Sequence, residues 1–218
     1  KPIYTGSLYE IEDGVFKIIA IDGYRMAIRS ENVDSESKNR FVVPGKTQHE
    51  VLKLLTDDEE NTEIIIGQRH ITFKIKNYRI ISRLIEGTFI EYKSAIPKET
   101  KTEVVINTRT IIDAVERMSL LNNDRIQSPV RCIFSDDEIK LSCTSAVGRA
   151  NDVISVPIIG ESVEIGFNNR YLLDALKNAD TDEIKLILNG SLTAMIVKPV
   201  KGDSYLSIVV PMRLANES

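Results

Sequence analysis

Short runs in which apolar and polar residues alternate fill most of the chain, a pattern typical of half-buried β-strands. Turn residues such as Asp22-Gly23 and Asp136-Asp137 separate successive runs and favour antiparallel hairpins. The runs predicted as strands are 3–12, 15–21, 25–33, 40–45, 62–68, 70–76, 78–85, 103–108, 128–135, 138–145, 148–156, 163–167, 182–189, 192–199 and 204–211. The first three of them predict a three-stranded antiparallel meander.

Three segments repeat apolar residues at helical spacing instead. The predicted helices are 46–55, 108–121 and 168–179. The first of these places Val51, Leu52 and Leu55 on one face. The second has Asn107 or Thr108 as its N-cap, because either side chain can accept a hydrogen bond from the first helical turn.

Both halves of the chain follow the same order of strand, helix and three strands, so one supersecondary unit is repeated. Within the chain, residues 51–55 align with residues 172–176. The same offset places three residues of the first half on three of the second: Ile71, Phe73 and Ile75 on Leu192, Ala194 and Ile196. The repeat predicts an α+β protein with two domains, residues 1–100 and 101–218.

The first half lacks the opening strand and helix that the second half has at 103–121. We therefore expect the chain to begin part-way into its first domain and to be a piece of a longer protein. A sheet edge and a helix-binding face are then expected to be exposed.

The composition is that of an ordinary globular protein. The 218 residues are 42% hydrophobic and 28% charged, which is enough for two compact domains, and no long apolar run suggests a membrane span. Cys132 and Cys143 lie inside strand-like runs without metal-ligand spacing, which favours buried, reduced thiols and a cytoplasmic location. The net charge of −4 argues against a chain that coats nucleic acid everywhere, although it leaves room for a locally basic face.

The sequence offers little catalytic chemistry. His49 and His70 fall in different predicted elements and have no neighbour at ligand spacing, which argues against a metal site or a histidine-activated nucleophile. No phosphate-binding loop and no nucleophile elbow is found, and the acidic run 57–60 is best explained as a solvated loop. We therefore expect no enzyme, no metal and no cofactor.

Basic residues recur on all three predicted helices: Lys46, Lys53, Arg109, Arg117, Arg170 and Lys177. On a single helix such residues usually mark a solvated face. Their repetition, with the acids concentrated in loops and strand ends, favours one face able to meet phosphates without reading base edges.

The closing run 204–214 predicts a strand that stops at Pro211. Proline has no N–H to give to a sheet, so Met212, Arg213 and Leu214 are predicted to lie outside the regular pairing. Two large apolar side chains and a cation at an exposed end favour a binding surface over a frayed terminus.

Four motifs give the chain a specific resemblance to the bacterial DNA sliding clamp, the beta subunit of DNA polymerase III. They are AIDGYRMA at 20–27, LIEGTFIEYKSAIP at 84–97, EIGFNNRYLLDAL at 164–176 and VVPMRL at 209–214. The resemblance spans essentially all 218 residues. It covers the last two of the family's three domains, without the opening strand and helix of the second.

The resemblance implies repeated clamp-type domains with antiparallel sheets outside and helices lining the inner face of a head-to-tail dimeric ring. Such a ring encircles duplex DNA without reading its sequence and has no catalytic residues. It serves as a processivity factor that tethers the catalytic subunit of DNA polymerase III, the clamp loader and other replication and repair proteins, which carry short linear motifs such as QLxLF. No membrane is involved.

Carried over residue by residue, the family's partner-peptide groove between its last two domains falls on Tyr4, Ile21, Gly23, Tyr24, Arg25, Met26, Asn168, Tyr171, Leu192, Ala194, Ile208, Val209, Val210, Pro211, Met212, Arg213 and Leu214. The resemblance also assigns Leu120 and Leu121 to the ring interface. For this pair a hydrophobic helix end buried in the core remains an equal alternative.

One alternative function comes from another class. Twisted sheets backed by helices also build pockets for small apolar ligands, so an α+β ligand-binding domain with no role on DNA would fit the pattern of elements. An enzyme would need a reactive polar cluster that the sequence lacks.

Overall fold

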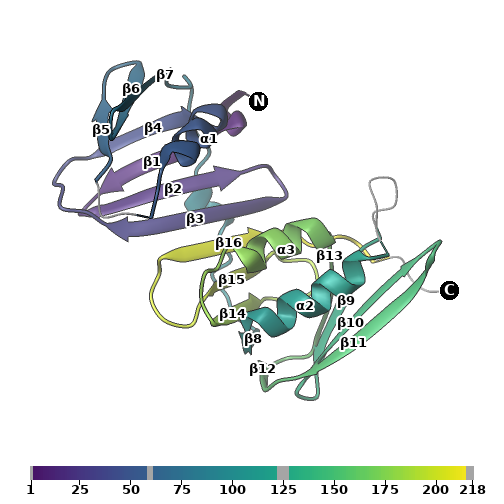
Figure 1. Ribbon diagram of the computed structural model, residues 1–218. Coiled ribbons are helices and arrows are strands. Elements are labelled where there is room, and N and C mark those ends of the chain that lie inside the picture. Colours follow the sequence, from purple (N-terminus) through teal and green to yellow (C-terminus); the bar gives the residue numbers. More distant parts are fainter. Residues whose placement is uncertain (1, 58–60, 122–127, 215–218) are drawn as a thin grey trace. The chain divides into compact units, whose positions relative to one another are not determined.

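The structure is a computed structural model that describes residues 2–57, 61–121 and 128–214. The chain divides into two compact units (Figure 1). The N-terminal unit consists of Lys1–Asp22 and Ile28–Glu91, and the C-terminal unit consists of Gly23–Ala27 and Tyr92–Ser218. A five-residue segment, Gly23–Ala27, thus belongs to the C-terminal unit although it lies inside the sequence of the other.

The N-terminal unit contains two antiparallel sheets and one α-helix in its described part. The elements are η1 (Pro2–Thr5), β1 (Gly6–Glu12), β2 (Val15–Ile21), β3 (Arg25–Asn32), β4 (Asn39–Pro44), α1 (Gly45–Leu54), β5 (Glu63–Ile66), β6 (His70–Ile75) and β7 (Tyr78–Arg83). Strands β3-β2-β1-β4 form one sheet and β5-β6-β7 the other. The predicted meander is therefore confirmed, except that residues 3–5, predicted as the start of its first strand, belong to the 3-10 helix η1.

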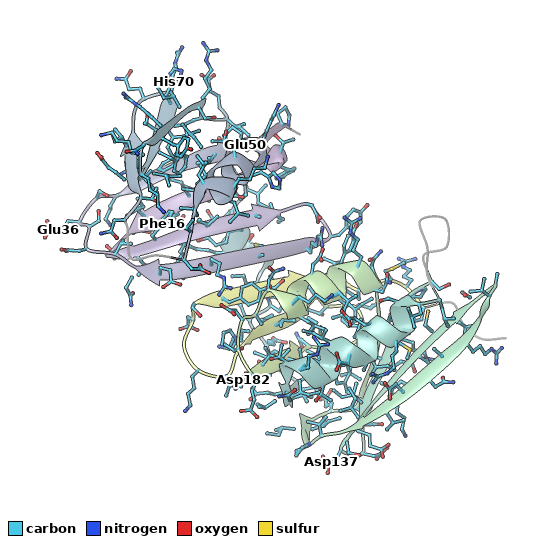
Figure 2. The ribbon with its side chains drawn as sticks, viewed as in Figure 1. Phe16, Glu36, Glu50, His70, Asp137 and Asp182 are labelled. Atoms are coloured by element: carbon cyan, nitrogen blue, oxygen red, sulfur yellow. The ribbon has the colours of Figure 1, made fainter. Side chains whose placement is uncertain are left out.

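The core of this unit lies between its two sheets and α1. Alternate residues of β6, Ile71, Phe73 and Ile75, are buried together with Tyr9 of β1. The Tyr9 ring packs edge-on against Phe16, which Figure 2 labels, with centroids 5.3 Å apart. Burial raises the pKa of Tyr9 to about 12, because the charged phenolate is poorly solvated there.

Of Val51, Leu52 and Leu55, which the sequence places on one face of α1, only Val51 is buried. Val51 is buried, whereas Leu52 is 65% exposed and Leu55, just past the helix, is 45% exposed. Strand β5 is an edge of its sheet, and its Ile64 and Ile65 are exposed too. Periodicity identifies the apolar stripe of a helix but does not show what covers it. The exposed sheet edge and the exposed helix face that the repeat predicts are both present.

The C-terminal unit is built on the same plan with two additional strands and one additional α-helix among the described residues. Its elements are η2 (Tyr92–Ala95), β8 (Thr102–Asn107), α2 (Thr108–Ser119), β9 (Val130–Ser135), β10 (Glu138–Ser145), β11 (Gly148–Ser155), β12 (Ile158–Gly160), β13 (Val163–Phe167), α3 (Asn169–Lys177), β14 (Glu183–Leu188), β15 (Met195–Pro199) and β16 (Tyr205–Val209). Antiparallel strands run in the orders β12-β8-β14-β15-β16 and β11-β10-β9-β13. The three-residue strand β12 was not predicted.

Helices α2 and α3 lie side by side in this unit (Figure 1) and bury their apolar stripes in one core with both sheets. An asparagine is the N-cap of each helix. The Oδ1 atom of Asn107 accepts from Thr110 N at 3.0 Å, and that of Asn168 accepts from Tyr171 N at 3.2 Å. Of the two N-caps that the sequence left open for α2, the structure selects Asn107.

Both cysteines are free and buried in this core, as predicted. Burial raises the pKa of the Cys132 thiol to about 12, since the apolar surroundings disfavour the thiolate. These thiols therefore act as small apolar side chains.

One detail of the predicted repeat is wrong. Strand β15 starts at Met195, so Leu192, which is 84% exposed, and Ala194 lie in the preceding loop. They do not correspond to the buried Ile71 and Phe73. The reason is the loop from β14 to β15, which is longer than the loop from β5 to β6, so one offset cannot serve both.

Candidate functional site

The chain beyond β16 is anchored to the edge of another strand. The backbone N–H of Met212 donates to the carbonyl of Gly166 on β13 at 2.8 Å and forms an isolated antiparallel bridge. Residues 212–214 thus lie outside the regular strands, as predicted, and Met212 adds one isolated bridge. Residues 215–218 lie outside the described part of the chain.

Gly166 makes this anchoring possible because it has no Cβ. A Cβ placed there would lie 2.6 Å from Leu214 Cδ2 and 3.0 Å from the Met212 carbonyl oxygen. Both contacts are shorter than ordinary van der Waals separations. This role could not be predicted from the sequence, since Gly166 looks like any glycine within a strand.

The segment Gly23–Ala27 is bound to the same end of the unit. Val210 N donates to the Tyr24 carbonyl at 2.9 Å, and Ser207 Oγ donates to the Met26 carbonyl at 3.0 Å. Gly23 has a φ of 90°, a left-handed conformation that suits glycine at the turn before Tyr24. Residues assigned to the groove from two distant motifs are thereby brought together.

Tyr24, Arg25, Tyr171 and Asp174 form one cluster, which we name the Arg25 cluster. The rings of Tyr24 and Tyr171 stack with centroids 5.9 Å apart, and the Arg25 guanidinium lies over the Tyr171 ring at 4.4 Å. Arg25 Nη1 also donates to Asp174 Oδ2 in a partly buried ion pair. Asp174 was missed from the sequence, although its spacing of three from Tyr171 places both on one helix face.

Asn168 combines two roles. Its side-chain oxygen caps α3 and accepts from the backbone N–H groups of Arg170 and Tyr171. No hydrogen bond between described residues uses its Nδ2 group, which is a donor available to a bound carbonyl group.

A pocket of about 670 Å³ lies beside the anchored tail. Its lining comes from β13 and the residues before it, the β14–β15 loop, and the tail: Glu161, Ser162, Val163, Glu164, Ile165, Gly166, Gly190, Ser191, Leu192, Met212, Arg213 and Leu214. Leu192 thus lies with the tail, as the resemblance implies. Other assigned residues are internal: Val209 belongs to the core of the unit, and Ile208 pairs with Ile196 in the sheet.

Ala194, Val210 and Pro211 complete the assigned residues of the C-terminal unit. Ala194 and Pro211 are half-buried, and Val210 is exposed. Tyr4 and Ile21 belong to the N-terminal unit: the Tyr4 ring meets the Phe89 ring edge-on at 6.3 Å, and Ile21 ends β2.

The predicted DNA-facing cations are largely paired with acids on the helices or adjacent strands. Lys53 pairs with Glu50, which Figure 2 labels on α1, at 2.9 Å. Lys177 of α3 pairs with Glu116 of α2 at 2.6 Å. Hydrogen bonds from these lysines hold the pKa values of Glu50 and Glu116 below their usual range, so both acids stay charged near neutrality.

Arginines of α2 are paired in the same way. Arg109 pairs with Asp113 at 2.8 Å, and Arg117 Nε donates to Asp152 of β11 at 2.9 Å. The few acids that do lie on the helices are thus enough to pair with several of the cations, two of them at i,i+3 or i,i+4 spacing on one helix face. No ion pair among the described residues includes Lys46 or Arg170.

The two leucines at the end of α2 have different surroundings. Leu120 is 82% exposed, whereas Leu121 is partly buried and packs against the core of the unit. The two explanations that the sequence left equal thus apply to different residues: Leu121 contacts the core, and Leu120 is available at the surface.

The described residues include no cluster of His, Cys, Asp and Glu side chains that could hold a metal ion. Among the same residues, no helix is both long enough and apolar enough to cross a membrane.

Comparisons with known proteins match the chain over nearly its whole length. The family model for the central domain of the DNA polymerase III beta subunit matches residues 1–91, and the model for its C-terminal domain matches residues 93–213. The beta sliding clamp of Halalkalibacterium halodurans is 30% identical over 220 residues, and that of Bacillus subtilis is 30% identical over 218. Each alignment covers 98% of this chain and 58% of the relative.

The crystal structure of the Bacillus subtilis DNA polymerase sliding clamp superposes with a TM-score of 0.95 at 30% identity. That superposition covers 99% of this chain and 58% of the crystal chain. The repeated α+β units with antiparallel sheets define a clamp-type protein. The chain belongs to the family of DNA polymerase III beta subunits, the sliding clamps, and spans 58% of the length of the curated relatives it matches.

Proposed function

We propose that this chain supplies the second and third domains of a non-catalytic processivity factor that encircles duplex DNA as a head-to-tail dimeric ring. The family match over both units supports this proposal. A closed ring leaves a duplex only by opening, so a polymerase tethered to it stays near the primer end without tight binding. The small-ligand domain is not favoured, because the match covers the whole fold rather than one pocket.

Contacts with DNA in this proposal are weak and electrostatic. Most helix cations are already neutralised by neighbouring carboxylates, which reduces the attraction for phosphates. Arg170 and Lys46 would then supply a larger share of the contacts. Binding that is sequence-independent and falls steeply with salt would allow the ring to slide.

The surface around the tail and the Arg25 cluster would bind short linear motifs of the polymerase catalytic subunit, the clamp loader and other replication and repair proteins. The observation that carries this proposal is the hydrogen bond that joins Val210 of the tail to Tyr24, whose ring stacks on Tyr171, within the C-terminal unit. Aromatic faces, an amide donor at Asn168 and exposed aliphatic groups suit an extended peptide with a polar anchor and apolar ends. We place this activity in the cytoplasm.

Calorimetry with a peptide of the QLxLF kind tests the site. Binding is expected in the roughly micromolar range, because a short extended peptide loses chain entropy on docking. Deleting residues 211–218 removes the tail but no strand of either sheet. Peptide binding should therefore be lost with little change in the melting temperature, and unchanged affinity would refute the peptide site.

Fluorescence anisotropy with duplex DNA tests the second activity independently. The chain should bind weakly, with no sequence preference and a steep salt dependence. Tight, salt-resistant or sequence-selective binding would contradict the sliding proposal. In the full-length protein, Leu120→Lys should weaken the dimer without unfolding the subunit.

A further inference from the structure

Arg25 is the cation that the resemblance places at the peptide groove, but its charge is already matched within the C-terminal unit. Its guanidinium pairs with Asp174 of α3 and lies 4.4 Å from the centre of the Tyr171 ring. The Arg25 side chain is 29% exposed and that of Asp174 is 48% exposed, so the ion pair is only partly screened by water. A guanidinium that lies over a ring and pairs with a carboxylate presents less net positive charge to a ligand than a solvated one does.

Asp174 stands at an unfavourable position for an acid. It lies in the last turn of α3 (Asn169–Lys177), where the helix dipole is negative and disfavours a carboxylate. The ion pair with Arg25 offsets this cost. The same pair joins the Gly23–Ala27 segment to α3, so it links two parts of the proposed peptide surface that are 149 residues apart.

We propose that Asp174 is a positioning residue that sets the charge preference of the partner-peptide surface. By holding Arg25 over the Tyr171 ring and offsetting its charge, Asp174 makes the surface select a neutral polar anchor over an acidic one. This inference rests on the proposed peptide-binding function and adds a specificity determinant that neither the resemblance nor the comparisons assign.

The chemistry predicts a change in selectivity rather than a uniform loss. Without the Asp174 carboxylate, the guanidinium of Arg25 keeps its charge and loses this ion pair, so an acidic anchor gains attraction. A peptide with a neutral amide as its anchor gains little affinity. A surface charge contact supports a selectivity change of about three- to fivefold, and added salt should reduce it.

The test uses two peptides, one of the QLxLF kind and one in which Glu replaces the leading Gln. Calorimetry measures both with the unaltered chain and with Asp174→Asn. The unaltered chain should prefer the Gln peptide, and Asp174→Asn should improve binding of the Glu peptide about three- to fivefold while changing that of the Gln peptide less. Asp174→Glu keeps the charge and should restore the original preference.

The control is Arg25→Gln in combination with Asp174→Asn, which removes both charges and should return the preference to that of the unaltered chain. Equal weakening of both peptides in Asp174→Asn would mean a purely structural role and overturn the proposal, as would an unchanged preference. If Asp174→Asn does not fold, Asp174→Ser replaces it under the same criteria. Failure of the unaltered chain to bind either peptide would refute the proposed function instead.

Discussion

The anchoring of the tail on β13 leads to a sharp prediction for Gly166→Ala. Gly166 is not among the residues with positive φ, so alanine is compatible with its backbone. The new Cβ would lie 2.6 Å from Leu214 Cδ2, whereas carbon atoms in contact normally stay about 3.5–4.0 Å apart. The Leu214 side chain must move, and the Met212 carbonyl oxygen, at 3.0 Å, must yield slightly.

The expected losses of stability in Gly166→Ala are modest and confined to the tail and its contact with β13. Weakening the hydrogen bond from Met212 N to Gly166 O costs about 1 kcal/mol, and partial loss of the Leu214 contact costs about 1 kcal/mol more. Alanine in an extended strand offsets about 0.4–1 kcal/mol of this through the unfolded state. The free energy of global unfolding should therefore fall by about 1–1.6 kcal/mol at most, while the tail opens more often.

Hydrogen exchange at the Met212 amide measures this opening directly. Its rate should rise about tenfold for each 1.4 kcal/mol lost locally, and the affinity for the peptide of the QLxLF kind should fall with it. Adding Leu214→Ala removes the closest clash and should restore part of the Met212 protection. Gly67→Ala, where a Cβ meets only His70 O at 3.3 Å, is the control for a general glycine effect.

A protected Met212 amide and unchanged peptide affinity in Gly166→Ala would refute the reasoning. The tail would then be held by contacts other than the bridge to β13. Faster exchange with unchanged affinity would separate anchoring from peptide binding.

Three further predictions follow from exposure, capping and burial. Leu120→Lys should change the free energy of unfolding by less than about 0.5 kcal/mol, whereas Leu121→Lys should lower it by about 1–3 kcal/mol. Equal losses of stability in urea titrations of the two variants would contradict the exposed position of Leu120 and the partly buried position of Leu121. Asn168→Asp keeps an acceptor for the N-cap of α3 but removes the Nδ2 donor. Helix content measured by circular dichroism should stay the same, while peptide affinity falls about threefold or more. Unchanged affinity would mean that the Nδ2 group does not bind the peptide. Burial raises the pKa of Tyr9 from 10.0 to about 12 and that of Cys132 from 9.0 to about 12, so the contribution of each group to stability is fully present below its unfolded pKa and is lost as the pH rises through about 12. Tyr9→Phe should therefore reduce the loss of stability at alkaline pH in urea titrations. An identical pH profile of stability would count against the burial effect.

Local patterns in the sequence were sufficient for most of the fold. The alternation of apolar residues in β6 predicts which of them are buried, because strand geometry sends successive side chains to opposite faces. The same reasoning failed for Leu52 on α1, because periodicity identifies an apolar face without showing what covers it. Strand β12 has only three residues, too few for a recognisable alternation.

The site was predictable in part. The four motifs brought Tyr24, Tyr171 and Met212 into one expected surface through resemblance. Asp174 could not be assigned from the sequence, because its partner Arg25 is 149 residues away and an acid on a helix has many possible partners. Gly166 was missed for a similar reason, since its role depends on the close approach of Leu214.

The membership of Gly23–Ala27 in the C-terminal unit affects how the chain can be divided experimentally. A fragment starting at Tyr92 would contain every helix and strand of that unit except the start of β3, yet it would lack Tyr24 and Arg25. Val210 N and Ser207 Oγ would lose their acceptors, and Asp174 would lose its guanidinium partner. Cutting the chain at the Glu91–Tyr92 junction would therefore remove part of the proposed peptide site, although the C-terminal fragment would retain its two described sheets. Failure of such a fragment to bind the peptide would not refute that site.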